Sequence, residues 1–94
     1  MRVRWLRKAL RDLDQEATYI AADNAVAARI VVERVLAAAA LLAEHPGLGR
    51  PGRVAGTREL LVNKTRYIVP YRVRGESVEI LRVFHTSRRL PHRW

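Results

Sequence analysis

The chain has 94 residues, a formal net charge of +9 and no cysteine. This length allows one domain with a single modest core, and a hydrophobic fraction of 49% is typical of a folded chain. The absence of cysteine excludes disulfides and thiolate zinc sites and favours a cytoplasmic location. The longest apolar run, residues 35–43, is too short to span a bilayer, so no membrane association is expected.

The positive charge is concentrated in the second half of the chain. Residues 1–49 carry seven basic and six acidic side chains, whereas residues 50–94 carry eleven basic and three acidic ones. All the basic residues except Lys8 and Lys64 are arginines. Because arginine binds phosphate and carboxylate groups through paired hydrogen bonds, we expect an anionic partner: nucleic acid, the ribosome or an acidic protein segment. A basic surface that is merely solvated is the alternative.

The first half of the chain predicts a short strand followed by two helices. Residues 2–5 alternate polar and apolar, as an edge strand does. An apolar stripe at three- and four-residue steps then predicts an amphipathic helix, with Asp23-Asn24 as the break after it. The stripe consists of Leu6, Leu10, Leu13, Ala17 and Ile20, and the opposite, solvent-facing side holds Arg7, Lys8, Arg11, Asp12, Gln15 and Glu16. A second helix is expected over residues 25–44, and its polar face disappears after Arg34. Either the protein's own layers or a partner must therefore cover its second side.

The second half predicts a Gly/Pro-rich connection and a three-stranded meander. The connection, residues 46–56, lacks the glycine and lysine spacing of a phosphate-binding P-loop. Strands are expected at 58–62, 67–73 and 78–84, with a tight turn at Gly75. Pro70 cannot donate a ladder hydrogen bond, which predicts a bulge or an exposed edge. The expected fold class is α+β: an N-terminal strand and a two-helix hairpin packed on an antiparallel sheet (β-α-α-β-β-β), with a short C-terminal turn or helix, all in one domain over residues 1–94.

Few side chains are placed for catalysis. The histidines, at positions 45, 85 and 92, lack metal-binding spacing, and neither serine lies in a nucleophile motif, so no metal and no cofactor are expected. A metal-independent site remains conceivable, in which arginines hold a phosphodiester while His85 moves a proton. Its arginines would be Arg66, Arg82, Arg88 and Arg89. The alternative is that His85 is a surface residue hydrogen-bonded to the backbone.

Four segments in this order resemble the RelE/ParE superfamily of type II toxins. They read WLRKALRDLDQEATYIAADNAVAA, GLGRPGRVAGTREL, YIVPYRV and VEILRVFHTSRR, and together they cover nearly the whole chain. The resemblance implies a growth-arresting toxin that is neutralised by a cognate antitoxin encoded by an adjacent gene. It also implies that operator DNA is contacted only through the antitoxin. An acidic antitoxin tail that folds on the toxin would suit the basic second half and the thinly polar second helix.

The resemblance allows two targets. The RelE branch cleaves mRNA on the ribosome, and it commonly has an arginine where this chain has Ile68. The ParE branch inhibits DNA gyrase, and the sequence of the segment YIVPYRV resembles that branch more closely. The expected function is therefore non-enzymatic poisoning of gyrase, with no catalytic residues. The alternative is a ribosome-dependent mRNA endonuclease that would use Arg66, Arg82, His85 and Arg88. A third reading is a general nucleic-acid-binding module.

A docking surface for the target or the antitoxin is expected on the arginines of the second half. It consists of Arg50, Arg53, Arg58, Arg66, Arg72, Arg74, Arg82, Arg88 and Arg89.

Overall fold

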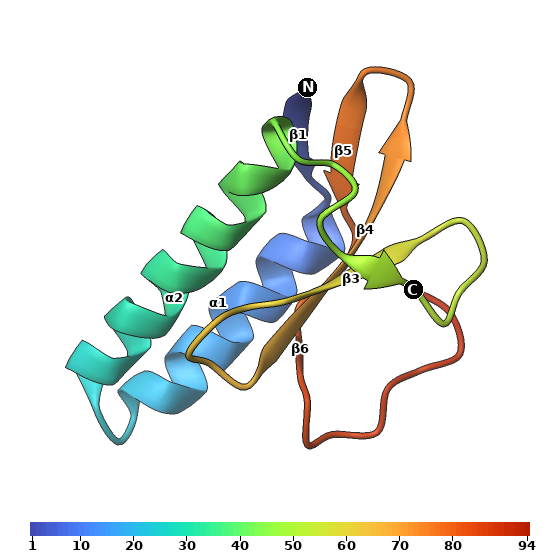
Figure 1. The fold of residues 1–94 in the computed structure, drawn as a ribbon. Helices are drawn as coiled ribbons and strands as arrows, with labels where there is room; N and C mark the ends of the chain where they lie inside the picture. Colours follow the sequence, from blue (N-terminus) through green and yellow to red (C-terminus); the bar gives the residue numbers. More distant parts are fainter.

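The structure, a computed structural model, describes residues 1–94. A short strand, β1 (Arg2–Trp5), leads into an antiparallel hairpin of two helices, α1 (Arg7–Ala21) and α2 (Ala25–Ala40) (Figure 1). The 3₁₀ turn η1 (Leu41–Ala43) extends α2. The remaining strands are β2 (Arg50–Pro51), β3 (Arg58–Leu61), β4 (Tyr67–Arg74), β5 (Ser77–Ile80) and β6 (Phe84–His85).

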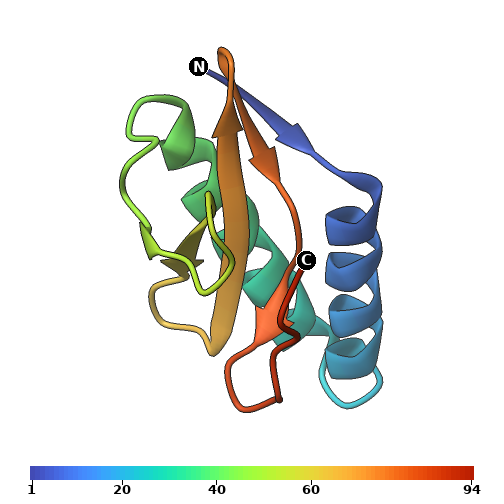
Figure 2. The ribbon, with the colours of Figure 1, turned by 90° about the vertical axis from the view of Figure 1, so that its right-hand side faces the viewer.

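The strands form one six-stranded sheet in the order β1-β5-β4-β3-β2, with β6 paired to β4 beyond the end of β5. The expected α+β class, the helical hairpin on the sheet and the edge position of β1 are confirmed. The sheet is mixed, however, because β1 pairs with β5 in parallel. Neighbouring strands of the meander are joined by short turns and must be antiparallel, whereas β1 reaches its partner through the helices and is free to run parallel. Figure 2 shows β1 alongside β5, with the helices on one side of the sheet.

The last predicted strand is interrupted by a β-bulge opposite Pro70. The backbone carbonyl of Pro70 accepts from the amides of both Leu81 and Arg82, at 2.9 and 3.4 Å. The pairing then resumes one residue out of register, with Ile68 opposite Phe84. The expected bulge is confirmed. Its cause is that a backbone N–H at position 70 would point toward the last predicted strand, and proline has none. The alternative of an exposed edge is wrong, since Pro70 is fully buried.

The first helix buries a stripe that differs from the predicted one. Ala9, Leu13 and Glu16 face the interior, whereas Leu10 is half exposed. The prediction wrongly placed Glu16 on the solvent face, because a carboxylate is buried only when partners for it are supplied from elsewhere in the fold. The break between the helices is as expected: the Asn24 side chain accepts from the amide of Ala27 at 3.0 Å and caps α2.

The second helix is covered on one side only. Ala28, Val35 and Ala39 are buried against the rest of the protein, whereas Leu36 is 44% exposed. The sheet and α1 therefore leave an apolar part of α2 open, and intramolecular packing does not complete its burial. No helix in the structure is long and apolar enough to cross a membrane.

The core lies between the helices and the inner face of the sheet. It unites residues of α1 and α2 with alternate residues of the strands, among them Val69, Val78 and Ile80. Tyr71 is fully buried, and its hydroxyl donates to the carbonyl of Pro46 at 2.7 Å and accepts from the amide of Gly49 at 2.8 Å. This residue fastens the Gly/Pro-rich connection to the centre of the sheet.

Candidate functional site

The outer face of the sheet, turned away from the helices, carries a row of charges across three strands. Arg4 on β1, Glu79 on β5 and Arg72 on β4 are register neighbours. The carboxylate of Glu79 accepts from Arg72 Nε at 2.7 Å and from Arg4 NH1 at 3.4 Å. Hydrogen bonding from Arg72, reinforced by the charges of Arg74 and Arg4, lowers the pKa of Glu79. Two cations share one anion, so the row keeps a net positive charge.

A second carboxylate, Glu59 on β3, organises the Gly/Pro-rich connection. It is 3% exposed, and its oxygens accept from Arg53 Nε at 3.0 Å, the Arg53 amide at 2.8 Å and Arg50 NH2 at 3.3 Å. Burial by itself would raise the pKa of Glu59. The hydrogen bonds and charge of Arg53, together with the hydrogen bond from Arg50, outweigh burial and lower the pKa. Arg58 donates to the carbonyls of Gly47 and Gly49 instead.

A bidentate ion pair connects the bulge to α1. Arg82 donates through Nε and NH2 to the two oxygens of Asp12, at 2.7 and 3.1 Å. Asp12 also accepts from the amide of Val83 at 3.0 Å, which satisfies a backbone donor released by the bulge. The guanidinium of Arg82 lies 4.6 Å from the centre of the Phe84 ring. Arg82 is therefore mainly a structural residue here.

Glu16 of α1 forms a third buried carboxylate site. It accepts from the hydroxyl of Tyr67 at 2.9 Å and forms an ion pair with Arg88. Burial, together with the hydrogen bond to Glu16, raises the pKa of Tyr67 to about 12. The same carboxylate raises the pKa of Arg88. Two of the sequence-predicted cations, Arg82 and Arg88, are thus neutralised by acids of one helix.

His85 lies on the rim of a hollow of about 450 Å³, together with Arg66, Ser87 and Arg88. Its ring packs edge-on against Tyr67, with 5.2 Å between ring centres. Its Nδ1 accepts from the amide of Ser87 at 3.2 Å and lies 2.6 Å from the Ser87 hydroxyl. A neutral imidazole in this position therefore carries its proton on Nε2. The structure brings His85, Arg66 and Arg88 together, but Arg82 is directed to Asp12.

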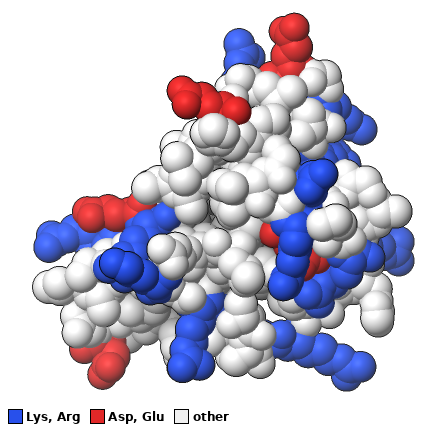
Figure 3. Space-filling model, viewed as in Figure 1, with Lys and Arg blue, Asp and Glu red and all other residues white.

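The nine arginines expected to form a docking surface fall into two groups. Five form ion pairs with carboxylates, and Arg58 is bound to backbone carbonyls. The side chains of Arg66, Arg74 and Arg89 are exposed and form no hydrogen bond within the protein. The five are Arg50, Arg53, Arg72, Arg82 and Arg88. Figure 3 shows basic side chains outnumbering acidic ones on one face and gathering toward the side where β2 and the C-terminal end lie in Figure 1.

The acidic partners of these arginines are the residues that sequence reasoning missed. Glu59 and Glu79 stand in otherwise apolar strands, and that isolation is a signal of a buried, paired carboxylate. Nothing in the sequence pattern of α1 shows that Asp12 and Glu16 face the last third of the chain. Only the tertiary structure, which places α1 beside Tyr67 of β4 and beside residues 82–88, brings these groups together.

Ile68, which stands where the mRNA-cleaving branch commonly has an arginine, is 1% exposed. It pairs with Leu61 on one side and Phe84 on the other. This aliphatic side chain packs between the neighbouring strands, and because it is buried and uncharged it cannot bind a phosphate.

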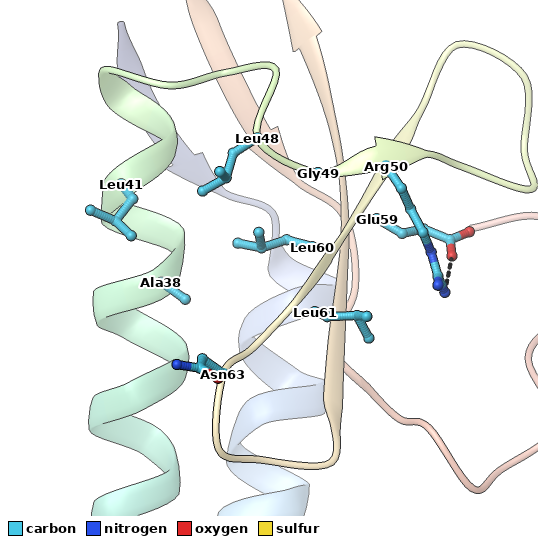
Figure 4. Close-up of a pocket in the computed structure, with 9 residues that line it drawn as sticks. All are labelled: Ala38, Leu41, Leu48, Gly49, Arg50, Glu59, Leu60, Leu61 and Asn63. Carbon is cyan, nitrogen blue, oxygen red and sulfur yellow. Dashed lines mark hydrogen bonds and ion pairs between the residues drawn. The ribbon is translucent and has the colours of Figure 1, made fainter.

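An apolar groove of about 400 Å³ lies between α2 and β3. Leu48 and Leu60 project toward Leu41 and Ala38 of the helical side (Figure 4). Leu41 and Leu48 are 54% and 52% exposed, so the groove is open to solvent. The paired side chains of Arg50 and Glu59 lie on the side of β3 that faces away from α2 (Figure 4).

Comparison with known proteins agrees with this fold. The family described as "ParE toxin of type II toxin-antitoxin system, parDE" matches residues 3–90. "Putative toxin Y4kP" of Sinorhizobium fredii is 47% identical over 90 residues, which is 96% of this chain and 93% of the relative. "Toxin RelE2" of Caulobacter vibrioides is 37% identical, over 89% of this chain and 93% of the relative. A solved structure described as "Chromosomal ParDE TA system from P. aeruginosa" superimposes with a TM-score of 0.80 at 31% identity, covering 90% of this chain and 95% of the other.

The helical hairpin on a basic mixed sheet, together with these matches, defines the class as a type II toxin of the RelE/ParE superfamily. The family match spans almost the whole chain, from β1 to the residues that follow β6. The chain belongs to the ParE toxin family.

Proposed function

We propose that this ParE-family toxin arrests growth by poisoning DNA gyrase without cleaving nucleic acid itself. Membership of the ParE family supports this target, since the resemblance described above implies gyrase as the target of the ParE branch. The observation that carries the proposal is the neutralisation of the two cations nearest His85 in sequence. Arg82 is held by Asp12 and Arg88 by Glu16. A phosphodiester-cleaving site depends on charged groups left free for the transition state.

The alternative is cleavage of mRNA on the ribosome, and one observation favours it. His85, Arg66 and Arg88 share the rim of one hollow, and Nε2 of His85 is free to exchange a proton. Against it stand the ion pair of Arg88 with Glu16 and the buried aliphatic side chain of Ile68. Removal of one donor from an oxyanion site costs roughly 3–4 kcal/mol of transition-state stabilisation. A site that lacks two such groups is a weak catalyst.

A paired assay with the purified toxin separates these targets. Supercoiling by gyrase and trapping of cleaved DNA are measured beside codon-phased mRNA cleavage in a translating extract. We expect inhibited supercoiling and intact mRNA, and unchanged supercoiling with cut mRNA would refute the gyrase proposal. If mRNA is cut, His85→Ala must abolish the cleavage for the alternative to hold.

Gyrase inhibition would need the cations that the fold leaves free. We expect that Arg66→Gln, Arg74→Gln and Arg89→Gln, combined in one variant, keep the fold and lose most of the inhibition. The matched control replaces three exposed basic residues of the helices, Arg11, Arg29 and Arg34, by Gln. If both variants inhibit equally, total charge rather than this surface governs the interaction.

A cognate antitoxin is the proposed second partner, and it would be the component that contacts operator DNA. The exposed apolar groove between α2 and β3 supports this partner, because patches of this kind mark interaction surfaces. The excess of basic over acidic side chains in residues 50–94 suits an acidic antitoxin tail. Leu48→Asn should weaken rescue by the antitoxin while toxicity remains. Leu10→Asn is the matched control, since Leu10 is equally exposed on α1 and does not line the groove. Equal loss of rescue in both variants would place the antitoxin elsewhere.

A further inference from the structure

The C-terminal residue, Trp94, returns to the outer face of the sheet and forms one wall of a hollow. Its indole Nε1 donates to the hydroxyl of Thr57 at 3.2 Å, and its ring lies 5.6 Å from the ring of Phe84. Figure 1 shows the C-terminal end on the side of the sheet opposite the helices. The hollow between Trp94, the start of α1 and the loop 54–57 has a volume of about 600 Å³. This lies within the usual range of small-ligand sites.

The walls of this hollow combine apolar and cationic groups. Leu6, Val54 and Leu81 supply apolar surface beside the indole, and Arg7, Lys8 and Arg72 supply three cations. The side chains of Arg7 and Lys8 are exposed and form no hydrogen bond or ion pair within the protein.

Arg72 is held in place by a carboxylate that leaves most of its donors free. Glu79 accepts from its Nε, and no partner is recorded for its two terminal nitrogens. The guanidinium therefore has a fixed orientation and retains its outer N–H groups for a further anion.

We propose that this hollow binds a nucleotide, with the phosphate held by Arg7, Lys8 and Arg72 and the base placed against Trp94. A flat base matches an aromatic wall flanked by aliphatic side chains, and the negative charge of a phosphate matches the cations on the rim. An acidic peptide would use the cations but leave the indole and the aliphatic wall without a matching group. The hollow is separate from the rim that carries His85, and the proposal does not depend on gyrase as the target.

The test follows the two indole N–H signals of the ¹⁵N-labelled full chain by NMR. The probes are dAMP, a single-stranded decadeoxynucleotide, inorganic phosphate and a hexaglutamate peptide. Trp5 is the internal reference, because its side chain packs against the core. We expect dAMP and the oligonucleotide to shift the Trp94 signal and leave the Trp5 signal in place. Tighter binding of the oligonucleotide identifies nucleic acid as the source of the nucleotide, whereas equal affinities identify the free nucleotide.

Charge-neutralising variants locate the phosphate. Arg7→Gln combined with Lys8→Gln should weaken oligonucleotide binding about tenfold and reduce the salt slope by about 0.7, which is the contribution of one phosphate contact on a single strand. The matched control, Arg11→Gln combined with Arg29→Gln, removes the same charge from exposed helix positions outside the hollow and should change affinity less than twofold. Circular dichroism verifies that each variant is folded.

Four results would overturn the proposal: an unmoved Trp94 signal, equal losses in both double variants, phosphate binding as tightly as dAMP, or displacement of the oligonucleotide by equimolar hexaglutamate. Equal losses in both double variants would mean that general electrostatic attraction accounts for the binding. Phosphate binding as tight as that of dAMP would mean that the base makes no contact with the hollow. Displacement by hexaglutamate would mean that the hollow binds acidic peptides.

Discussion

Replacement of Asp12 by alanine tests whether the ion pair with Arg82 joins α1 to the bulge. The substitution removes three hydrogen bonds, two from the guanidinium and one from the amide of Val83. Hydrogen bonds to charged groups contribute roughly 1.5–3 kcal/mol each when their partners are fully buried. The side chain of Arg82 is 21% exposed and keeps its contact with Phe84, so it recovers part of its hydration. We therefore expect a loss of about 2 kcal/mol in the free energy of unfolding.

For a domain of this length, a loss of that size lowers the melting temperature by about 10 °C. Thermal and urea unfolding followed by circular dichroism measure it. Asp14→Ala is the matched control, because Asp14 is an exposed acid of the same helix without a recorded partner. It shares the gain in helix propensity on going to alanine, so the difference between the two variants isolates the ion pair. Equal stabilities within about 0.5 kcal/mol would refute the structural role given to Arg82.

Three further predictions concern the polar network and the connection. The folded-state pKa of Glu59 lies below its ordinary value of 4.5, so the ionised carboxylate stabilises the fold above pH 4.5. This stabilisation is lost as the pH falls through the folded-state pKa. Glu59→Gln should therefore make the free energy of unfolding depend less on pH in the acid range, as measured by acid unfolding. In an ultraviolet titration, one tyrosine should ionise only near pH 12, provided that the fold persists, and Tyr67→Phe should remove that last step and lower stability by about 1.5 kcal/mol. A β-carbon on Gly49 would lie 2.7 Å from a buried tyrosine ring, so Gly49→Ala should cost about 1–3 kcal/mol, whereas Gly47→Ala, with no atom within 4 Å of the added carbon, should show no such clash.

Because of the arginine–carboxylate pairs, the net charge of the chain overstates the number of arginines that are available to an external polyanion. A net charge of +9 suggests a uniformly attractive surface for polyanions, yet several arginines serve as internal partners of Glu59, Glu79 and Glu16. Breaking a buried pair costs more than the pair contributes, because it leaves an uncompensated charge. Loss of toxicity in variants of these arginines therefore needs a stability measurement before it is assigned to target binding.

The sequence by itself determined the order of elements and the family. Hydrophobic periodicity predicted the two helices, alternation predicted the meander, and Gly75, in a turn with φ of +60°, marked the hairpin between β4 and β5. Pro70 predicted the bulge, because a missing backbone donor is a local covalent property. These features depend on neighbours within a few residues and are therefore readable without a structure.

Tertiary structure alone decided the parallel pairing of β1, the burial of Glu16 and the partners of the arginines. Asp12 meets Arg82 across 70 residues of chain, and Glu16 meets Arg88 across 72. The same is true of Trp94, which lies beside Thr57 and the start of α1 although both are remote from it in sequence. Charge pairing and pocket formation depend on distances between segments remote in sequence, and periodicity carries no information about those distances.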